Sequence, residues 1–493
     1  MSLINVQNLT FAYDGSYENV FENVSFQLDT DWKTGLVGRN GRGKTTFLRL
    51  LTGEYEYSGK ITASVEFTYF PFDVMNKERL VLEIFSDVCP NSEDWEIIRE
   101  FSYLQIEPDV LYSPFSNLSN GEQTKILIAG LFLRDNNFLL IDEPTNHLDI
   151  SARQTVAKYL GKKKGFILVS HDRAFLDSAV DHILSINRSD IELQTGDFSS
   201  YLKNFNDRQA AEAAQNERLK KDIDRLSESA KRASSWADKT EESKYGKADS
   251  GLKKDKGYVG HKAAKMMKKA KVTEARAQKA IEEKSMLLKN TESSEELKLH
   301  SMPHSKDKLV ALNDVNIFYG ERSIFSPVTF SLEQGERVAL EGKNGSGKSS
   351  ILKLITGADV SYTGSITLAS GLRISYVPQS SEDLSGSFSD YAKSAYIDES
   401  LFKTVLIKMG LSRDDFDKDT SDLSEGQKRK ILLSRSLCER AHLYIWDEPL
   451  NFLDIYSRLQ IESLIRRFDP TMIFVEHDKA FREAVATKII RLE

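Results

Sequence analysis

The feature of this 493-residue sequence that most constrains its fold is a phosphate-binding pattern that occurs twice. The pattern G-x-x-x-x-G-K-[ST] is matched by Gly38–Thr45 and again by Gly342–Ser349. Three later landmarks repeat in the same order, at offsets of 305 or 306 residues: Ser119 and Ser424, Glu143 and Glu448, His171 and His477. A single match to this pattern can arise by chance, whereas four ordered landmarks in register indicate two copies of one nucleotide-binding module.

We expect the two modules at residues 1–200 and 306–493, with a segment of a different kind at 201–305. In each module, short apolar runs alternate with loops and helical patterns, which predicts an α/β fold with a mostly parallel sheet and ligands at the carboxyl ends of its strands. The first module begins with an alternating strand at 4–11. The predicted buried strands are 34–37, 138–141 and 166–169 in the first module, and 338–340, 443–446 and 472–475 in the second.

In each loop, glycines let the backbone N–H groups approach phosphates at a helix N-terminus, where the helix dipole also favours anions. Lys44 and Lys348 are expected to neutralise the β- and γ-phosphates, and Thr45 and Ser349 to ligate Mg²⁺. The full predicted set of ATP-binding residues in the loops is Gly38, Asn40, Gly41, Gly43, Lys44, Thr45 and Thr46, and Gly342, Asn344, Gly345, Gly347, Lys348, Ser349 and Ser350.

Two apolar strands end in paired carboxylates, Asp142 and Glu143 in the first module and Asp447 and Glu448 in the second. The aspartates are expected to hold Mg²⁺, and the glutamates to polarise the attacking water. His171 and His477 each follow a later apolar strand, where a histidine can hydrogen-bond a γ-phosphate. The predicted catalytic residues are therefore Glu143, Glu448, His171 and His477.

The chain has a net charge of −7, yet residues 244–279 contain twelve Lys or Arg against three Asp or Glu. An otherwise acidic chain with one basic segment predicts that this segment binds an anionic partner. No apolar run approaches the roughly 18 residues that span a bilayer, and the start lacks a basic region followed by an apolar stretch. Cys89 and Cys438 match no metal spacing. We therefore expect a cytoplasmic protein without a membrane subunit.

Residues 206–240 and 261–290 lack proline and favour helix, and four glycines lie between them. This predicts two antiparallel helices joined by a basic tip near 244–261; a disordered charged linker is the alternative. A basic tip with aromatic residues suits RNA, because lysines neutralise phosphates and rings stack on bases. The predicted RNA-binding residues are Lys244, Tyr245, Lys247, Lys253, Lys254, Lys256, Tyr258, His261 and Lys262. A solvated helix face and packing within the hairpin are the alternatives.

The segments Leu118–Gln123 and Leu423–Gln427, each about 20 residues before a carboxylate strand, resemble the signature loop of ATP-binding-cassette (ABC) ATPases. That resemblance implies two tandem ABC-type domains of one monomer that sandwich two ATP molecules head to tail. Ser424 and Gly426 would then cap the ATP held by Lys44. By the same implication, Ser119 and Gly121 would cap the ATP held by Lys348, and Tyr13 and Tyr319 would stack on adenine.

The resemblance also reveals an unequal pair. Tyr376–Gln379 fits the glutamine loop of the family, in which Gln379 would contribute to the Mg²⁺ site, together with Thr45, Asp142, Ser349 and Asp447. The first module has Phe72 at the corresponding position, and phenylalanine cannot ligate Mg²⁺ or orient water. We expect slower hydrolysis at the Lys44 site.

The string Asp142–Asp149 matches the D-E-P-T-N-H-L-D sequence of the ABC-F group, and Asp447–Asp454 departs from it at Leu450 and Phe452. The short span from Tyr69 to Leu118 leaves no room for the arm insertion of housekeeping members. With the long linker, this resembles the Lsa/Vga-type antibiotic-resistance members. The resemblance implies a cytoplasmic ATPase, with ATP and Mg²⁺ as cofactors, that enters the ribosomal E site.

What this resemblance implies for partners is the bacterial 70S ribosome, with 23S rRNA near the peptidyl-transferase centre, and the P-site tRNA. The linker would displace that tRNA and dislodge lincosamides, streptogramin A compounds and pleuromutilins. One alternative is a general ABC-F factor that rescues stalled ribosomes without drug protection. Another, of a different class, is a tandem ATPase subunit of a membrane transporter.

Overall fold

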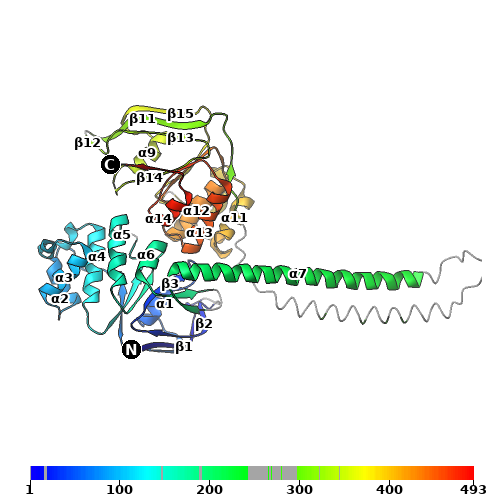
Figure 1. Ribbon diagram of the computed structural model, residues 1–493, viewed down its shortest axis with the longest axis horizontal. Coiled ribbons are helices and arrows are strands. Elements are labelled where there is room, and N and C mark those ends of the chain that lie inside the picture. Colours follow the sequence, from blue (N-terminus) through cyan, green and yellow to red (C-terminus); the bar gives the residue numbers. More distant parts are fainter. Residues whose placement is uncertain are drawn as a thin grey trace, which may run out of the picture. The chain divides into compact units, whose positions relative to one another are not determined.

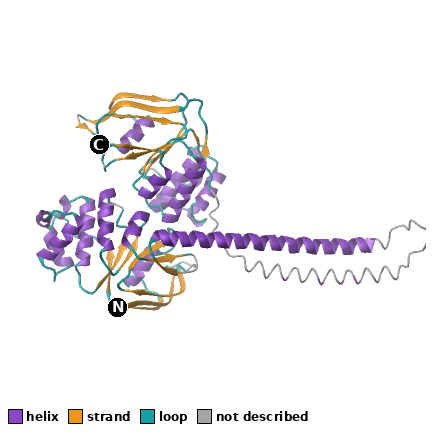
Figure 2. Ribbon diagram, in the orientation of Figure 1, coloured by secondary structure: helices purple, strands orange, loops and turns teal. Residues whose placement is uncertain are grey.

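The computed structural model describes residues 2–15, 19–145, 148–187, 191–242, 265, 268, 272, 279, 297–320, 322–343, 345–382 and 384–492. Two compact units are resolved: Met1–Tyr201 with Glu295–Glu493, and Leu202–Ser294. The first unit contains both nucleotide-binding modules, and each module has a strand-rich part and a helix-rich part (Figures 1 and 2). The domain boundaries at 200 and 305 stay a prediction.

The first module combines a small antiparallel sheet with a larger, mostly parallel one (Figure 1). The antiparallel sheet has the order β2-β1-β4, and the second sheet has the order β5-β6-β7-β3-β8-β9, in which only the β8–β9 pairing is antiparallel. The strands are β1 Leu3–Phe11, β2 Phe21–Asp29, β3 Lys33–Gly38, β4 Ser58–Thr62, β5 Glu66–Phe70, β6 Asn137–Asp142, β7 Phe166–Val169, β8 His182–Ile186 and β9 Ile191–Thr195.

The helices of the first module connect these strands. They are α1 Lys44–Leu51, α2 Val81–Val88, α3 Asp94–Leu104, α4 Asn120–Phe132, α5 Ile150–Gly161 and α6 Arg173–Ala179, with short 3₁₀ turns η1 Pro108–Tyr112 and η2 Phe115–Asn117. Side chains of α1 share one buried core with residues of both sheets, including Phe47, Leu36 and Val6. This core holds the phosphate loop between β3 and α1 in a fixed place.

The second module repeats this plan. Its antiparallel strands pair as β12-β11-β13, with β15 on β11; its parallel sheet has the order β16-β18-β19-β14-β20, and β10 pairs with β17. The strands are β10 His300–Ser301, β11 Lys308–Tyr319, β12 Arg322–Ser323, β13 Val328–Glu333, β14 Arg337–Glu341, β15 Tyr362–Leu368, β16 Ile374–Val377, β17 Arg440–Ala441, β18 Leu443–Asp447, β19 Met472–Val475 and β20 Lys488–Arg491.

Along the chain, the helices of the second module alternate with its strands, in an order that matches the first module. They are α9 Lys348–Ile355, α10 Phe388–Ser394, α11 Glu399–Lys408, α12 Glu425–Cys438, α13 Ile455–Phe468 and α14 Lys479–Val485, with 3₁₀ turns η3 Asp414–Asp417 and η4 Thr420–Asp422. The predicted strands are confirmed in both modules, and β6, β7, β18 and β19 are buried along their length. The predicted α/β class is confirmed.

The interdomain segment begins with one long helix, α7 Phe198–Glu242, of 45 residues. At about 1.5 Å per residue, such a helix is roughly 67 Å long. It begins earlier than the expected residue 206 because Phe198 and Tyr201 are buried in its first turn. Of the expected return helix, Lys265, Lys268, Val272 and Lys279 are described, and they are helical.

Among the described residues, no helix is both long and apolar enough to cross a membrane.

Candidate ATP-binding sites

Both phosphate loops contain backbone conformations that favour glycine. Gly43 has φ of 88° and Gly347 has φ of 81°, and each immediately precedes the first residue of a helix. A Cβ on Gly43 would lie 2.6 Å from Val20, and a Cβ on Gly347 would lie 2.7 Å from the Phe325 ring. A larger residue is therefore excluded by conformation and by space, as an anion-cradling loop requires.

The two loop lysines are buried and curl over their own loops. Lys44 Nζ donates hydrogen bonds to Gly38 O at 2.8 Å and Asn40 Oδ1 at 3.2 Å, and Lys348 Nζ donates to Gly342 O at 2.9 Å. Burial lowers the pKa of both ammonium groups, against the opposing effect of nearby carboxylates. A buried cation beside a helix N-terminus is suited to bind a phosphate anion.

Oxygen atoms suitable for a hard divalent cation gather beside each loop. Thr45 Oγ1 donates to Asp142 Oδ2 at 2.7 Å, and the Ser349 side chain hydrogen-bonds Asp447. Asp447 Oδ1 is buried without a hydrogen-bond partner. A hydroxyl, a carboxylate and space for water or phosphate oxygens fit Mg²⁺. In the first module Tyr69 also donates to Asp142 Oδ2, at 2.9 Å.

The four predicted catalytic residues form two matching pairs. Nε2 of His171 lies 3.3 Å from Glu143 Oε1, and Nε2 of His477 lies 3.2 Å from Glu448 Oε1. Both glutamates have positive φ, 49° and 47°, and their N–H groups donate to the ends of β7 and β19. The fold thus holds each glutamate at the edge of its parallel sheet.

The two glutamates nevertheless differ electrostatically. Burial, with a contribution from neighbouring Asp142, raises the pKa of Glu143 to about 8. Burial also opposes ionisation of Glu448, but hydrogen bonds involving His477, Gln379 and Asn451 hold its pKa at about 2. At neutral pH the Glu448 carboxylate is ionised, whereas the Glu143 carboxyl is largely protonated.

The glutamine loops differ as the sequence indicates. Strand β5 pairs with β6 up to Phe70 and Ile141, and β16 pairs with β18 up to Val377 and Trp446. Phe72 and Gln379 therefore hold equivalent places, two residues beyond the last paired position. Only Gln379 has a side chain that can hydrogen-bond a carboxylate.

The Lys44 loop contacts the second module directly. The N–H of Asn40 donates to Asp454 Oδ2 at 3.3 Å, and its side-chain Nδ2 donates to Phe452 O at 2.9 Å. A Cβ on Gly426 would lie 3.2 Å from that same Asn40 nitrogen. Gly426 thus approaches the Lys44 loop closely. Ser424, which begins α12 as its N-cap, lies two residues before Gly426.

Asp454 is buried, and its carboxylate caps α13 through the N–H of Ser457 at 2.9 Å. Burial opposes its ionisation, but Lys430, 3.6 Å away, and the capping N–H depress the pKa of this carboxyl. The N–H of Asn40 therefore donates to a carboxylate that is ionised and held in a fixed position.

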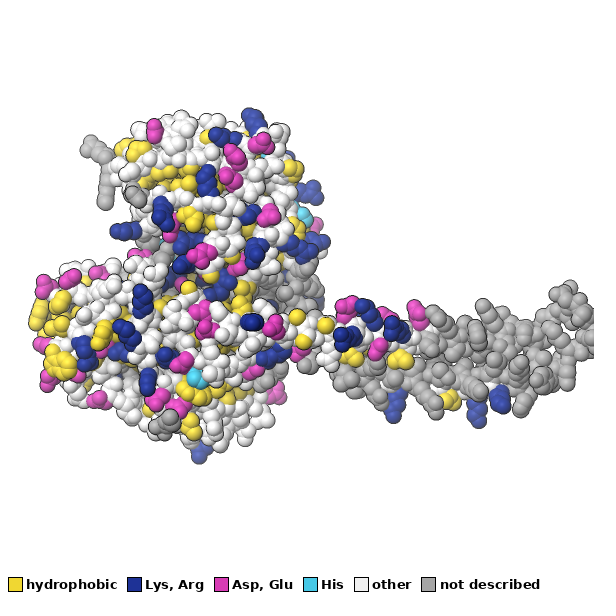
Figure 3. Space-filling view, in the orientation of Figure 1, with side chains coloured by type: hydrophobic (Ala, Val, Ile, Leu, Met, Phe, Trp, Pro, Cys, Tyr) yellow, Lys and Arg dark blue, Asp and Glu magenta, His cyan; other side chains and the backbone are white. Residues whose placement is uncertain are grey.

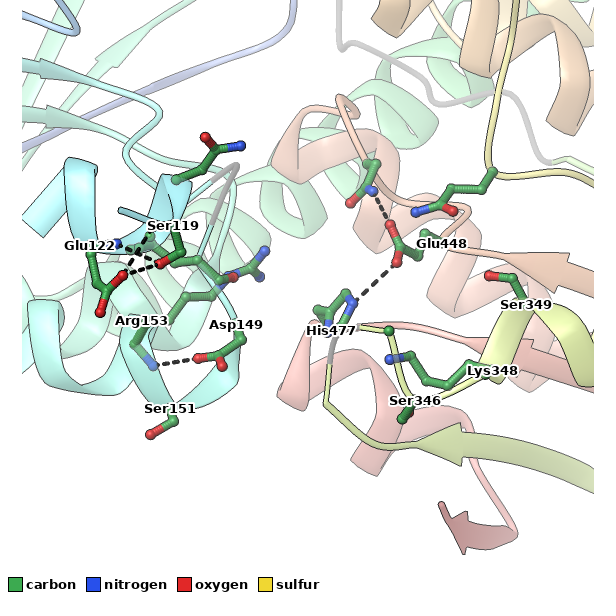
Figure 4. A pocket seen from close by; sticks show the side chains of 18 of the residues that line it. Ser119, Glu122, Asp149, Ser151, Arg153, Ser346, Lys348, Ser349, Glu448 and His477 are labelled. Carbon is green, nitrogen blue, oxygen red and sulfur yellow. Dashed lines mark hydrogen bonds and ion pairs between the residues drawn. The ribbon is translucent and has the colours of Figure 1, made fainter. Parts of the chain in front are cut away.

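The Lys348 loop faces an open cavity of about 1480 Å³. Ser119, Asp149 and Arg153 of the first module lie on one wall, and Lys348, Ser349, Glu448 and His477 of the second lie on the other (Figure 4). Gly121, Gly345, Gly347, Ser350 and Gln379 also line it. The cavity exceeds the roughly 300–1,000 Å³ of ordinary ligand pockets.

The remaining predicted residues take different places. The Tyr13 hydroxyl hydrogen-bonds Thr46 Oγ1 at 2.6 Å, so Tyr13, which is 45% exposed, lies beside the Lys44 loop. Gly41 has positive φ of 80° within that loop. Asn344 and the side chain of Tyr319 lie outside the described part of the structure, as do Lys244, Tyr245, Lys247, Lys253, Lys254, Lys256, Tyr258, His261 and Lys262.

Some residues at these sites were not predicted. Asn451 Nδ2 donates to Glu448 Oε2 at 2.6 Å, and Asp149 and Asp454 are equivalent helix caps at the two sites. All three belong to the repeated eight-residue strings, which was the available signal. Buried Arg429 was also missed, and a residue-by-residue comparison of the two modules would have found it opposite Thr124.

The chain matches the ABC transporter family over residues 21–146 and 325–451, which together make up just over half of it. The chain therefore belongs to the ABC transporter family, and it carries two domains of the type that binds and hydrolyses ATP.

Among individual proteins, the chain is 26% identical to the ribosome protection protein VmlR of Bacillus subtilis, covering 96% of this chain and 84% of that protein. It is 27% identical to the ATP-binding protein Uup of Caulobacter vibrioides, covering 96% and 75%. Identity is 25% to the energy-dependent translational throttle protein EttA of Escherichia coli K12, covering 96% and 89%.

The fold also resembles that of the archaeal ribosome recycling factor aABCE1, solved in complex with a ribosomal stalk protein. The TM-score is 0.63 at 20% identity, covering 99% of this chain and 87% of that one. The relatives confirm the predicted resemblance to the ABC-F group.

Proposed function

We propose that this chain is an ATPase with two composite sites that binds the bacterial 70S ribosome and protects it from antibiotics. The observation that carries the proposal is the similarity to a ribosome protection protein over 96% of the chain. The retained chemistry of both nucleotide sites supports it, because a purely structural protein would not need two carboxylate–histidine pairs beside phosphate loops.

In the proposed ATPase, ATP at the Lys44 site is capped by Ser424 and Gly426, and ATP at the Lys348 site by Ser119 and Gly121. The close approach of Gly426 to Asn40 supports the first pairing. The cavity that Ser119 and Lys348 line together supports the second.

At the Lys348 site, Glu448 accepts the proton of the attacking water, and Gln379 and His477 orient the water and the γ-phosphate. The low pKa of Glu448 keeps this carboxylate ionised and ready to accept a hydrogen bond. Ser349 and Asp447 would hold Mg²⁺, which would supply positive charge to neutralise the charge developing on the phosphates.

Ribosome binding is assigned to the interdomain segment. The described part of α7 carries side chains of both charges, as the Glu217–Lys221 pair at 2.6 Å illustrates (Figure 3). The positive surplus belongs to residues 244–279. Such a surplus favours RNA, because phosphate neutralisation releases counterions.

A charge-reversal variant tests this assignment. Replacing Lys253, Lys254 and Lys256 by Glu is expected to weaken ribosome co-sedimentation by about tenfold or more while leaving ATP binding unchanged. A variant with Lys220 and Lys221 replaced by Glu is the matched control, because these exposed lysines lie in the charge-balanced part of α7. Equal ribosome binding by all three proteins would contradict the assignment.

Within this function, the linker enters from the E site, displaces the P-site tRNA and reaches 23S rRNA near the peptidyl-transferase centre. It would thereby dislodge lincosamides, streptogramin A compounds and pleuromutilins. The second candidate is a general translation factor without drug protection, which the similarity to EttA favours.

Growth inhibition of a susceptible bacterium separates these candidates. The panel contains a lincosamide, a pleuromutilin, a streptogramin A compound and tetracycline, with the Glu143→Gln/Glu448→Gln variant as control. Selective protection against the first three drugs, lost in the variant, is expected. Ribosome binding without protection would favour the general factor, and absence of ribosome binding would favour a transporter subunit.

A further inference from the structure

Helix α12 serves both nucleotide sites. Near its N-terminus, the N-cap Ser424 lies two residues before Gly426, and Gly426 approaches the Lys44 loop, since a Cβ on it would lie 3.2 Å from Asn40 Nδ2. Three residues further along, Arg429 leaves the helix on the side of the Lys348 site and is 2% exposed. Since a helix rises about 1.5 Å per residue, these two regions are only about one turn apart.

The Arg429 guanidinium binds the backbone that carries the reactive groups of the Lys348 site. Its Nη1 donates to the carbonyls of Pro378 and Gln379, and its Nη2 donates to those of Asp447, at 2.6 Å, and Glu448. A guanidinium is planar and presents its donors in a fixed fork. It therefore fixes the glutamine loop and the end of β18 relative to α12.

This cation is buried with an anion that compensates it. Burial lowers the pKa of Arg429, and the carboxylate of Glu476, itself buried, is the strongest opposing influence. Glu476 is in turn held by the N–H groups of Leu450 and His477. Burying a charged pair is often no more stabilising than burying apolar side chains, so stability alone is a weak reason for this arrangement.

The first module has neither charge. By the repeat offsets, Thr124 stands opposite Arg429, and Ser170 stands opposite Glu476. Thr124 Oγ1 donates to Asn120 O at 2.9 Å, a carbonyl of its own helix. Thr124 thus does not take the role that Arg429 has in the second module. The second module therefore has an arginine that joins the signature helix α12 to the end of β18, and at the equivalent position the first module has a threonine that hydrogen-bonds within its own helix α4.

We propose that Arg429 is a positioning residue through which nucleotide engagement at the Lys44 site controls hydrolysis at the Lys348 site. This inference rests on the proposed two-site ATPase and deepens it. Phosphate contacts at Ser424 and Gly426 fix α12, and Arg429 transmits that position to Gln379 and Glu448. Misplacement of a reacting group by about 1 Å can cost about 100-fold in rate.

The coupling through Arg429 runs from the Lys44 site to the Lys348 site. Helix α4, which carries Ser119 and Gly121, has Thr124 in place of the arginine, so engagement at the Lys348 site lacks this route to Glu143. Coupling of binding affinities is reciprocal by thermodynamic necessity, but coupling of turnover need not be.

The test measures ATP turnover by the purified full-length chain in two backgrounds, intact and Lys44→Ala. With Arg429 present, Lys44→Ala is expected to lower kcat at the Lys348 site about tenfold or more. Arg429→Thr, which installs the residue of the first module, is expected to lower kcat while KM stays within about twofold. Adding Lys44→Ala to Arg429→Thr should then change kcat by less than about twofold.

Arg435→Thr is the matched control, because Arg435 lies on the same helix and binds Tyr376 O and Glu439 but not the carbonyls of the carboxylate strand. It should lose similar thermal stability and keep the dependence on Lys44. Arg429→Lys is measured as well, because its ammonium can replace some of the hydrogen bonds of the guanidinium. Its kcat should retain part of the dependence on Lys44, and it keeps the test valid if Arg429→Thr does not fold.

Three results would overturn this inference without affecting the proposed function. The first is that Lys44→Ala does not change kcat in a chain that contains Arg429. The second is that kcat still depends fully on Lys44 in Arg429→Thr (or in Arg429→Lys, if Arg429→Thr does not fold), and the third is that Arg435→Thr loses this dependence equally. Absence of ATP hydrolysis by the unmodified chain would overturn the proposed function as well.

Discussion

The Lys44 and Lys348 sites contain the same glutamate–histidine pairs but differ in surroundings. At the Lys44 site, Asp454 and Phe452 of the second module contact Asn40 of the loop. At the Lys348 site, the equivalent faces line an open cavity of about 1480 Å³. Matching motifs therefore do not make matching sites, because burial and a few neighbouring side chains shift the pKa values of Glu143 and Glu448 in opposite directions.

The largest expected effect concerns these two carboxylates. Glu448→Gln should lower the rate of ATP hydrolysis about 100-fold or more, since a positioned general base contributes roughly 10²–10⁴. Glu143→Gln should lower it far less, because the Glu143 carboxyl is largely protonated at neutral pH. Single-turnover hydrolysis by both variants is the measurement, and equal losses would break the comparison.

The sequence predicted most of what both sites share. The loops, the paired carboxylates and the histidines are local motifs, and the fold brings Glu143 to His171 and Glu448 to His477, a contact that the motifs alone did not predict. The absent glutamine at Phe72 predicted inequality.

Two differences between the sites could not be predicted from motifs: the direct contact of the Lys44 loop with the second module, and the different protonation of Glu143 and Glu448. They depend on contacts between residues about 410 positions apart, such as Asn40 with Phe452, and on the burial of Glu143. Such contacts leave no periodic pattern in a sequence. Likewise, Arg429 looks like an ordinary basic residue of a helix until its carbonyl partners are known.

The next expected effect concerns the helix caps. Asp454→Asn should destabilise the chain by about 3 kcal/mol, because it leaves buried Lys430 without its anion. Asp149→Asn should cost less than about 1 kcal/mol, since Asn is also a good N-cap and Asp149 is less buried. Chemical denaturation measures both. Equal losses would show that the two faces have the same electrostatic environment.

A smaller effect is expected in the pH dependence of the residual activity. In the Glu448→Gln variant, turnover at the Lys44 site should rise up to about tenfold per pH unit below pH 8, because the raised pKa of Glu143 keeps this base protonated there. In the Glu143→Gln variant, turnover should be nearly flat from pH 6 to 9, since the pKa of Glu448 is about 2. Two flat profiles would contradict the assigned difference in protonation.

The smallest expected effect exchanges the glutamine-loop residues. Phe72→Gln, in the Glu448→Gln background, supplies the hydrogen-bonding side chain that Gln379 provides at the other site, so the pH profile should shift to lower pH and turnover at pH 7 should increase about threefold. The reciprocal Gln379→Phe, in the Glu143→Gln background, should shift the Glu448 profile to higher pH. Because burial and Asp142 still raise the pKa of Glu143 after the exchange, Phe72→Gln should not make the two sites equal. If it did, the single loop residue, rather than the whole surroundings of the carboxylate, would account for the inequality.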